Sequence, residues 1–306
     1  MSLSDWIHDT STRIRSDGIT GVKESGRELY VGGLRRVNEV YPRGTNVYDR
    51  DWDLLILLDG CRTDLIRSVE DEWSFLDEPG SLTSVGSSSK QWLDRTVVDE
   101  RRAQLEQTAY VTANPFTHRI PGTDYLHTLD EVWRYAFDQE CGTIPARAVT
   151  ERAISTARTQ DTDRLIVHYM QPHFPSVPDP IGGELNPETL GEGAGWDSPW
   201  DSLRRGELEY ERVWESYRQN LQYVLKEVDL LLNNVTADQA VISADHGNAA
   251  GEWGIYGHPR VPLRVIRDVP WYRTSATDEQ TFAPTTKPGI ERHDINDKLE
   301  ALGYVA

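Results

Sequence analysis

Several side chains that can bind a metal ion stand directly after apolar runs of the sequence. Asp59 follows one such run, and the pair Asp245-His246 follows another. A third run, "LIVHYM", opens into the loop "QPHFP", which carries His173. Two carboxylates and an imidazole suit a borderline divalent cation such as Mn²⁺ or Zn²⁺. Asp59 alone would be read as a helix cap, but the whole set, in this order, predicts one shared site.

The elements expected to position these side chains alternate in type. The continuous apolar run Leu54–Leu58 is typical of a central parallel strand covered on both faces. Further strands are expected at 109–113, 164–170, 240–244 and 263–266, and helices at 88–106, 127–140, 146–160 and 205–234. This alternation predicts an α/β fold with a doubly wound, mostly parallel sheet flanked by helices. Ligands of such sheets bind beyond the carboxyl ends of the strands, where Asp59, His173 and Asp245 fall.

Two segments flank or interrupt this pattern. Residues 1–50 are expected to form an N-terminal helical arm of two short amphipathic helices, with an apolar stripe of Trp6, Ile7, Ile14 and Ile19. Weak contact with a membrane surface is the alternative role for the arm. Residues 51–306 would form the catalytic domain. Within it, 179–202 is a long irregular stretch that we interpret as a mobile lid carrying Trp196 and Trp200.

The composition limits the partners. The chain of 306 residues has 50 acidic and 32 basic residues and a net charge of −18. Nucleic acid is therefore not an expected partner, because its phosphates call for a basic face. The abundance of acids and the scarcity of Lys resemble proteins of halophilic archaea. The N-terminus has no apolar signal-peptide core, and no apolar run reaches membrane-spanning length, so a cytoplasmic location is expected.

Four motifs resemble the alkaline phosphatase superfamily in its sulfatase-like branch, across residues 52–306. They are "LLILLDGCRTDL", "LIVHYMQPHFP", "VISADHGNAAGEWGIYGHP" and "DKLEALGYVA". The resemblance implies an alkaline-phosphatase-like fold and one divalent metal ion (Mn, Zn or Ca) held by Asp59, Asp245 and His246. It also implies a Ser, Thr or formylglycine nucleophile that contacts the metal.

The nucleophile is expected in the segment "SLTSVGSSSKQWLDRT" (81–96), which runs into a helix. A hydroxyl at a helix N-terminus is well placed to attack phosphorus, since the backbone N–H groups there favour an oxyanion. Matching the family's motif puts the nucleophile at Ser87 or within one residue of it, with Ser88, Ser84 and Thr83 as alternatives in the stretch 83–89. Cys61 is not expected to be a formylglycine, because Cys-x-Pro-Ser-Arg is absent.

Histidines and basic residues would contact the substrate. His173 resembles the family's histidine that faces the anion or leaving oxygen, where it would donate a hydrogen bond or act as general acid. His258 stands where relatives place a Lys or His, whereas His168 is expected to pack or to orient a neighbour. Lys90 and Arg62 are the nearest basic candidates for neutralising the substrate's charge. A second metal is not expected, because Gln171 stands where an Asp would otherwise supply a ligand.

The leading hypothesis is a metal-dependent hydrolase or transferase that acts on phosphate esters through a covalent Ser intermediate. The substrate would be a small anionic ester, such as a phosphodiester or phosphonate, or a phospholipid or glycan headgroup. A sulfuric ester hydrolase and a non-catalytic binding protein of the same fold are the alternatives. Retention of Asp59, Asp245 and His246 argues against the non-catalytic protein.

Overall fold

The computed structural model describes residues 18–40, 44–181 and 198–288. The chain divides into two compact units: residues 1–42 with 259–262, and residues 43–258 with 263–306. In the first unit, α2 (Ile19–Val40) is a helix of 22 residues. None of the described helices is long and apolar enough to cross a membrane.

The second unit is built around a seven-stranded sheet in the order β2-β9-β6-β1-β5-β3-β4. Strands β6, β1, β5, β3 and β4 are parallel, whereas β9 is antiparallel to both of its neighbours. A separate pair, β7 and β8, forms a small hairpin. The bounds of the strands are β1 Leu54–Leu58, β2 Ser81–Thr83, β3 Thr108–Thr112, β4 Thr128–Glu131, β5 Arg164–Tyr169, β6 Ala237–Ser243, β7 Ala249–Ala250, β8 Tyr256–Gly257 and β9 Asp268–Ala276.

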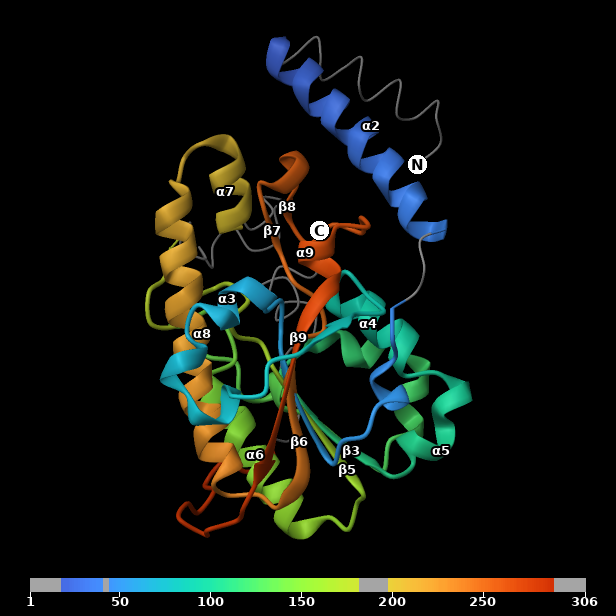
Figure 1. Cartoon of the computed structure of the whole chain (residues 1–306), viewed down its shortest axis with the longest axis vertical. Helices are drawn as coiled ribbons and strands as arrows, with labels where there is room; N and C mark the ends of the chain where they lie inside the picture. Colours follow the sequence, from blue (N-terminus) through green and yellow to red (C-terminus); the bar gives the residue numbers. More distant parts are fainter. Residues whose placement is uncertain (1–17, 41–43, 182–197, 289–306) are drawn as a thin grey trace. The chain divides into compact units, whose positions relative to one another are not determined.

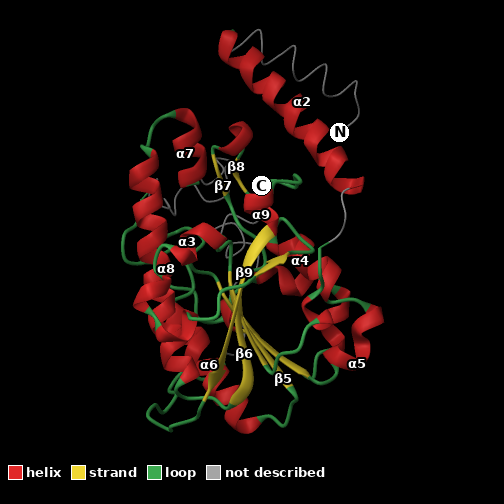
Figure 2. Cartoon of the chain, in the orientation of Figure 1, coloured by secondary structure: helices red, strands yellow, loops and turns green. Residues whose placement is uncertain are grey.

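Helices cover the sheet on two sides. Figure 1 shows α6 and α8 on one side and α4 and α5 on the other, and Figure 2 shows the strands between them. The described helices of this unit are α3 Thr63–Arg67, α4 Ser89–Thr96, α5 Arg102–Leu105, α6 Ala146–Thr159, α7 Pro199–Arg205, α8 Tyr210–Leu232 and α9 Arg264–Arg267. All five residues of β1 are buried between β5 and β6. The predicted α/β class with a mostly parallel sheet is confirmed.

Two predicted elements were wrong. The predicted strand 263–266 is the helical turn α9, and the strand β9 begins only at Asp268. Pro270 has no N–H to donate to a neighbouring strand, so the sequence did not indicate a strand at β9. In the structure, Pro270 pairs with Ser81 of the short strand β2. The predicted helix 127–140 is instead the edge strand β4 and a 3₁₀ turn, because pairing with β3 overrides local propensity.

Other predicted boundaries also differ from those in the structure. The predicted helix 88–106 is divided into α4 and α5, since Val97 leaves helical geometry with ψ of 81°. The arm's residues Trp6, Ile7 and Ile14 lie outside the described residues. The same holds for most of the 179–202 stretch and for Trp196. Its described end is helical: Trp200 belongs to α7 and is buried, so that end of the stretch is not a loop.

Candidate active site

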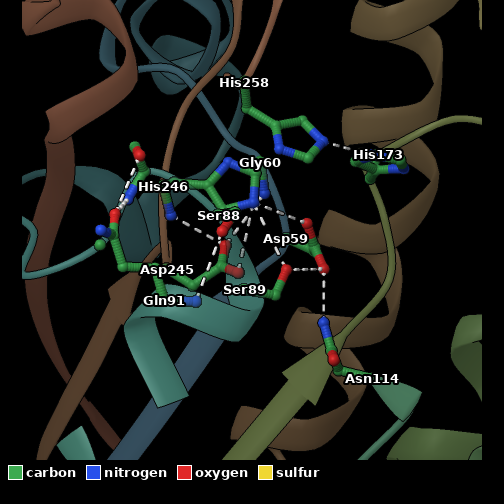
Figure 3. A network of polar contacts seen from close by, with 12 residues as sticks. Asp59, Gly60, Ser88, Ser89, Gln91, Asn114, His173, Asp245, His246 and His258 are labelled. Carbon is green, nitrogen blue, oxygen red and sulfur yellow. Dashed lines mark hydrogen bonds and ion pairs between the residues drawn. The ribbon is translucent and has the colours of Figure 1, made fainter. Parts of the chain in front are cut away.

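Loops that follow three parallel strands bring the predicted metal ligands together. Asp59 follows β1, the pair Asp245-His246 follows β6, and all three side chains are fully buried. Asn114 follows β3, and its amide donates a hydrogen bond to Asp59 Oδ2 at 2.9 Å. Figure 3 shows these side chains converging on one point. The predicted clustering of Asp59, Asp245 and His246 is present in the structure.

The hydrogen bonds of His246 and Asp245 orient their free atoms toward this point. His246 Nδ1 lies 2.9 Å from the carbonyl oxygen of Gly247, which only accepts, so Nδ1 carries the proton and Nε2 presents a lone pair. Asp245 Oδ1 accepts from the N–H groups of Gly60 and His246 at 3.1 and 2.9 Å. Asp245 Oδ2 is left facing His246 Nε2 at 3.5 Å.

Gly60 is required for this arrangement. Its φ of +66° lies in the left-handed region, which favours glycine. A Cβ built at this position would lie 2.7 Å from Nδ2 of Asn248. The turn that aims the Gly60 N–H at Asp245 therefore excludes any larger residue without a local shift.

Among the serines of the predicted stretch, Ser89 rather than Ser87 contacts the predicted metal ligands. The Ser89 hydroxyl, at the first residue of α4, donates to Asp59 Oδ2 at 3.1 Å and lies 3.4 Å from His246 Nε2. The Ser87 hydroxyl instead donates to Gln91 Oε1 at 3.0 Å, and Ser88 caps the helix by accepting from the Gln91 N–H. Ser89 lies within the predicted stretch 83–89 but was not singled out. The cap at Ser88, which places the next residue at the first helical position, was the missed signal.

The sequence did not indicate how close His168 lies to the two acids. It lies within β5, fully buried, with Nε2 at 3.7 Å from Asp245 Oδ2 and 3.9 Å from Asp59 Oδ2. These separations are too long for hydrogen bonds. His168 is the last residue but one of β5, so it lies at the same end of the sheet as the acids, although the apolar run around it gave no sign of this.

The donor set fits a divalent cation. Asp59 Oδ1, Asp245 Oδ2 and His168 Nε2 are buried atoms without a hydrogen-bond partner among the described residues. Ligand atoms of Asp59, His168 and Asp245 all lie within 4.8 Å of one another. Two ligands of one tetrahedral Zn²⁺ are about 3.4 Å apart, because each Zn–N or Zn–O bond is about 2.1 Å. The distances between neighbouring ligand atoms, from 3.4 to 3.9 Å, are close to that spacing.

The electrostatics of the two acids also favour a bound cation. Burial raises the pKa of Asp59 well above its usual range, and the nearby charge of Asp245 raises it further. Burial would also raise the pKa of Asp245, but the imidazoles of His246 and His168 and the Gly60 N–H hold it below its usual range. One proton on Asp59, or a cation, is required to keep both acids in this enclosure.

His173 and His258 lie together beside the metal ligands. Their Nε2 atoms are 3.2 Å apart, and the His258 ring centroid lies 4.4 Å from that of His246. His173 Nδ1 lies 2.6 Å from the Phe174 carbonyl oxygen and so carries a proton, which leaves its Nε2 to accept from His258. Burial lowers the pKa of His173 to about 4, and burial with the adjacent imidazoles lowers that of His258 well below its usual value.

The two predicted basic groups and Cys61 have other partners. Arg62 is buried and forms ion pairs with Asp64 at 2.6 Å and Glu252 at 2.8 Å. Lys90 pairs with Asp94 at 2.7 Å on α4. Their geometry therefore lends no support to a substrate contact. Cys61 is fully buried, and burial raises the pKa of its thiol, as expected for a packed residue.

Comparison with solved structures identifies the fold. The soluble domain of lipooligosaccharide phosphoethanolamine transferase A from Neisseria meningitidis matches with a TM-score of 0.50 and 16% identity, over 74% of this chain and 77% of that one. The integral membrane form of that transferase matches with a TM-score of 0.50 and 11% identity, over 90% of this chain. The match spans only 59% of that longer protein.

Sulfatases match as well, among them a 2-O GAG sulfatase with a TM-score of 0.47 and 14% identity, over 78% of this chain and 66% of that one. No protein-family model matches the sequence, and no curated protein does. The chain shares the α/β fold of the soluble domain of the phosphoethanolamine transferase. At these identities the likeness concerns the fold alone.

Proposed function

We propose that the protein is a metal-dependent transferase or hydrolase of phosphate esters that works through a covalent intermediate on Ser89. One observation carries the proposal. A helix-terminal hydroxyl lies 3.1 Å from Asp59 Oδ2 and 3.4 Å from His246 Nε2, among buried acids and imidazoles that have unsatisfied atoms. The phosphoethanolamine transferase with the same fold supports the choice of phosphate over sulfate.

Asp59, Asp245 and His246 would hold the cation, with the Ser89 oxygen beside it. A divalent cation at this point supplies Lewis acidity, which lowers the pKa of the hydroxyl and offsets charge on the phosphate oxygens. Only local groups can attract the anion, because the chain's net charge of −18 repels it from a distance.

In the first half-reaction, the Ser89 oxygen forms a bond to phosphorus while the bond from phosphorus to the leaving oxygen breaks. The Ser89 proton moves to Asp59 Oδ2, which already accepts its hydrogen bond. In the second half-reaction, water or an acceptor hydroxyl attacks phosphorus and gives its proton to the His173–His258 pair, while the Oγ–P bond breaks and Ser89 recovers its proton from Asp59. The choice of acceptor separates a hydrolase from a transferase.

The His173–His258 pair would supply the proton for the leaving oxygen. Both imidazoles are neutral near pH 7 in the absence of substrate, because burial lowers their pKa values. The negative charge of a bound phosphate raises the pKa of each imidazole, so the pair gains a proton when the anion is present. His258, whose Nε2 donates within the pair, lies beside His246 and thus close to the reacting group.

The test compares Ser89→Ala with Ser87→Ala on bis(p-nitrophenyl) phosphate and on p-nitrophenyl sulfate. We expect Ser89→Ala to lower phosphodiester turnover by about 10³-fold or more with metal content retained, because the bond-forming oxygen is lost. Ser87→Ala should retain most of the activity. Intact-protein mass spectrometry after an acid quench should detect the phosphorylated chain in the parent and not in Ser89→Ala. Loss of activity only in Ser87→Ala would return the assignment to Ser87, and turnover of the sulfate alone would indicate a sulfatase.

A further inference from the structure

His168 is held on two sides by aromatic side chains. The Tyr110 hydroxyl lies 2.7 Å from His168 Nδ1, and the planes of the two rings are nearly parallel, with 6° between them. At this distance the hydroxyl is hydrogen-bonded to Nδ1. Trp92 of α4 packs against the imidazole at 67°, with centroids 6.0 Å apart. This orientation leaves Nε2 aimed at the acids.

The opposite edge of the imidazole has no hydrogen-bond partner. His168 Nε2 is fully buried and unpaired among the described residues. A protonated Nε2 would need an acceptor within about 3.2 Å. The carboxylate oxygens it faces are 3.7 Å away on Asp245 and 3.9 Å away on Asp59, which is the spacing of atoms around a cation.

The Tyr110 hydroxyl can accept the proton of the opposite ring nitrogen. A hydroxyl has one proton and two lone pairs, so Tyr110 can accept from His168 Nδ1–H. Since no acceptor lies within hydrogen-bond reach of Nε2, this tautomer is the one that leaves no imidazole N–H buried without a partner. The imidazole then presents a lone pair at Nε2, as His246 does.

We propose that Tyr110 is a positioning residue that selects the Nδ1–H tautomer of His168 and makes Nε2 an additional metal ligand. This inference rests on the metal site of the proposed function. The complete donor set is then two imidazoles, two carboxylates and the Ser89 hydroxyl. Nitrogen donors favour Zn²⁺ and similar transition metals, whereas Ca²⁺ prefers a cage of oxygen ligands. Tyr110 thereby makes the site selective for a transition metal over Ca²⁺.

The experiment measures the affinities of Tyr110→Phe for Zn²⁺ and Ca²⁺ by competition with chelators. We expect Zn²⁺ affinity to fall about 10- to 100-fold, the usual effect of losing the partner of a ligating imidazole. Ca²⁺ affinity should change much less, so the Zn²⁺/Ca²⁺ ratio should fall. Tyr48→Phe is the matched control: the buried Tyr48 hydroxyl bonds Thr108, also on β3, and should leave both affinities unchanged.

The tautomer is read directly by NMR of the ¹⁵N-histidine-labelled, Zn²⁺-loaded protein, with His168 assigned from a His168→Gln variant. Protonated Nδ1 and metal-bound Nε2 are expected in the parent, with a loss of that fixed tautomer in Tyr110→Phe. A protonated Nε2, or an unchanged Zn²⁺/Ca²⁺ ratio in Tyr110→Phe, would overturn the inference. These readouts do not depend on turnover, so the inference about Tyr110 can fail while the proposed function holds. The proposed function fails by a different result, the absence of a phosphorylated Ser89.

Discussion

Two carboxylates buried side by side repel each other when both are ionised. In the Asp59–Asp245 pair, the surroundings of the two carboxylates differ, so that one of them holds a proton more readily than the other. Asp245 Oδ1 accepts from two backbone N–H groups, while Asp59 Oδ2 accepts from the Ser89 hydroxyl and the Asn114 amide. The backbone donors and imidazoles around Asp245 keep it ionised, and the proton resides on Asp59. Each carboxylate keeps one oxygen free for a cation.

The raised pKa of Asp59 predicts that metal binding is coupled to proton release. A cation binds the ionised carboxylate, so below the Asp59 pKa the metal must displace a proton, and affinity should rise about tenfold per pH unit. An Asp with the ordinary pKa of about 3.9 is already ionised between pH 5 and 7, so the metal affinity would not change with pH in that range. His168 adds no slope there, because burial lowers its pKa to about 4.

Calorimetry of Zn²⁺ binding to Ser89→Ala, in buffers of different ionisation enthalpy, measures the released protons. The alanine removes the Ser89 hydroxyl as a second proton source. We expect about one proton to be released per Zn²⁺ bound at pH 5, because the raised pKa keeps Asp59 protonated there in the absence of metal. No release at pH 5 would show that Asp59 is ionised without metal.

At the scale of elements, α8 holds the loop that carries His173. Tyr217 of this helix donates to the Gly60 carbonyl. Asn220, one turn further, donates to the carbonyl oxygens of Pro172 and His173, both at 3.1 Å, and accepts from the Val177 N–H at 3.1 Å. One buried helix face therefore fixes the loops after both β1 and β5.

Asn220→Ala should release the His173 loop without touching the metal ligands. It leaves buried carbonyls unpaired, so we expect a loss of about 2 kcal/mol in the free energy of unfolding. Turnover should fall at least about tenfold, since misplacing a catalytic group by about 1 Å can cost 10²-fold. Metal content should not change. Asn233→Ala, at the C-terminal end of the same helix, is the control, with an expected change within about 0.5 kcal/mol. A folded Asn220→Ala variant with full turnover would show that α8 does not position His173.

At the scale of the whole molecule, the site joins segments that are far apart in the chain. The proposed metal ligands come from the loops after β1 and β6 and from within β5, strands that lie side by side in the sheet. Since the unfolded chain does not hold these groups together, a cation that binds them stabilises the folded state.

Removal of metal should therefore lower the melting temperature. At a free Zn²⁺ concentration 100 times the dissociation constant, the stabilisation is about 2.7 kcal/mol, which corresponds to roughly 5 °C for a domain of this size. Thermal unfolding with Zn²⁺ and with EDTA measures this difference. Asp245→Asn should melt at one temperature in both conditions. An equal melting temperature of the parent protein with Zn²⁺ and with EDTA would argue against the proposed metal site.

The class of the fold could be predicted from the sequence, and so could the clustering of Asp59, Asp245 and His246 beyond the strand ends. The apolar run of β1 and the Asp-His pair after β6 are local signals, because a buried parallel strand needs apolar residues throughout and its end must turn at polar ones. The same reasoning missed β9 and β4, whose pairing depends on neighbours distant in the chain.

Which hydroxyl and which imidazoles face the acids is visible only in the folded chain. Three consecutive serines have the same chemistry, and the cap at Ser88 turns the Ser89 hydroxyl toward Asp59 while Ser87 turns to Gln91. His168 reads as one residue of an apolar strand until the register with β3 places it near Tyr110 and the acids. The physical reason is that residue type is local information, whereas the direction of a side chain depends on caps and strand pairing across the sheet.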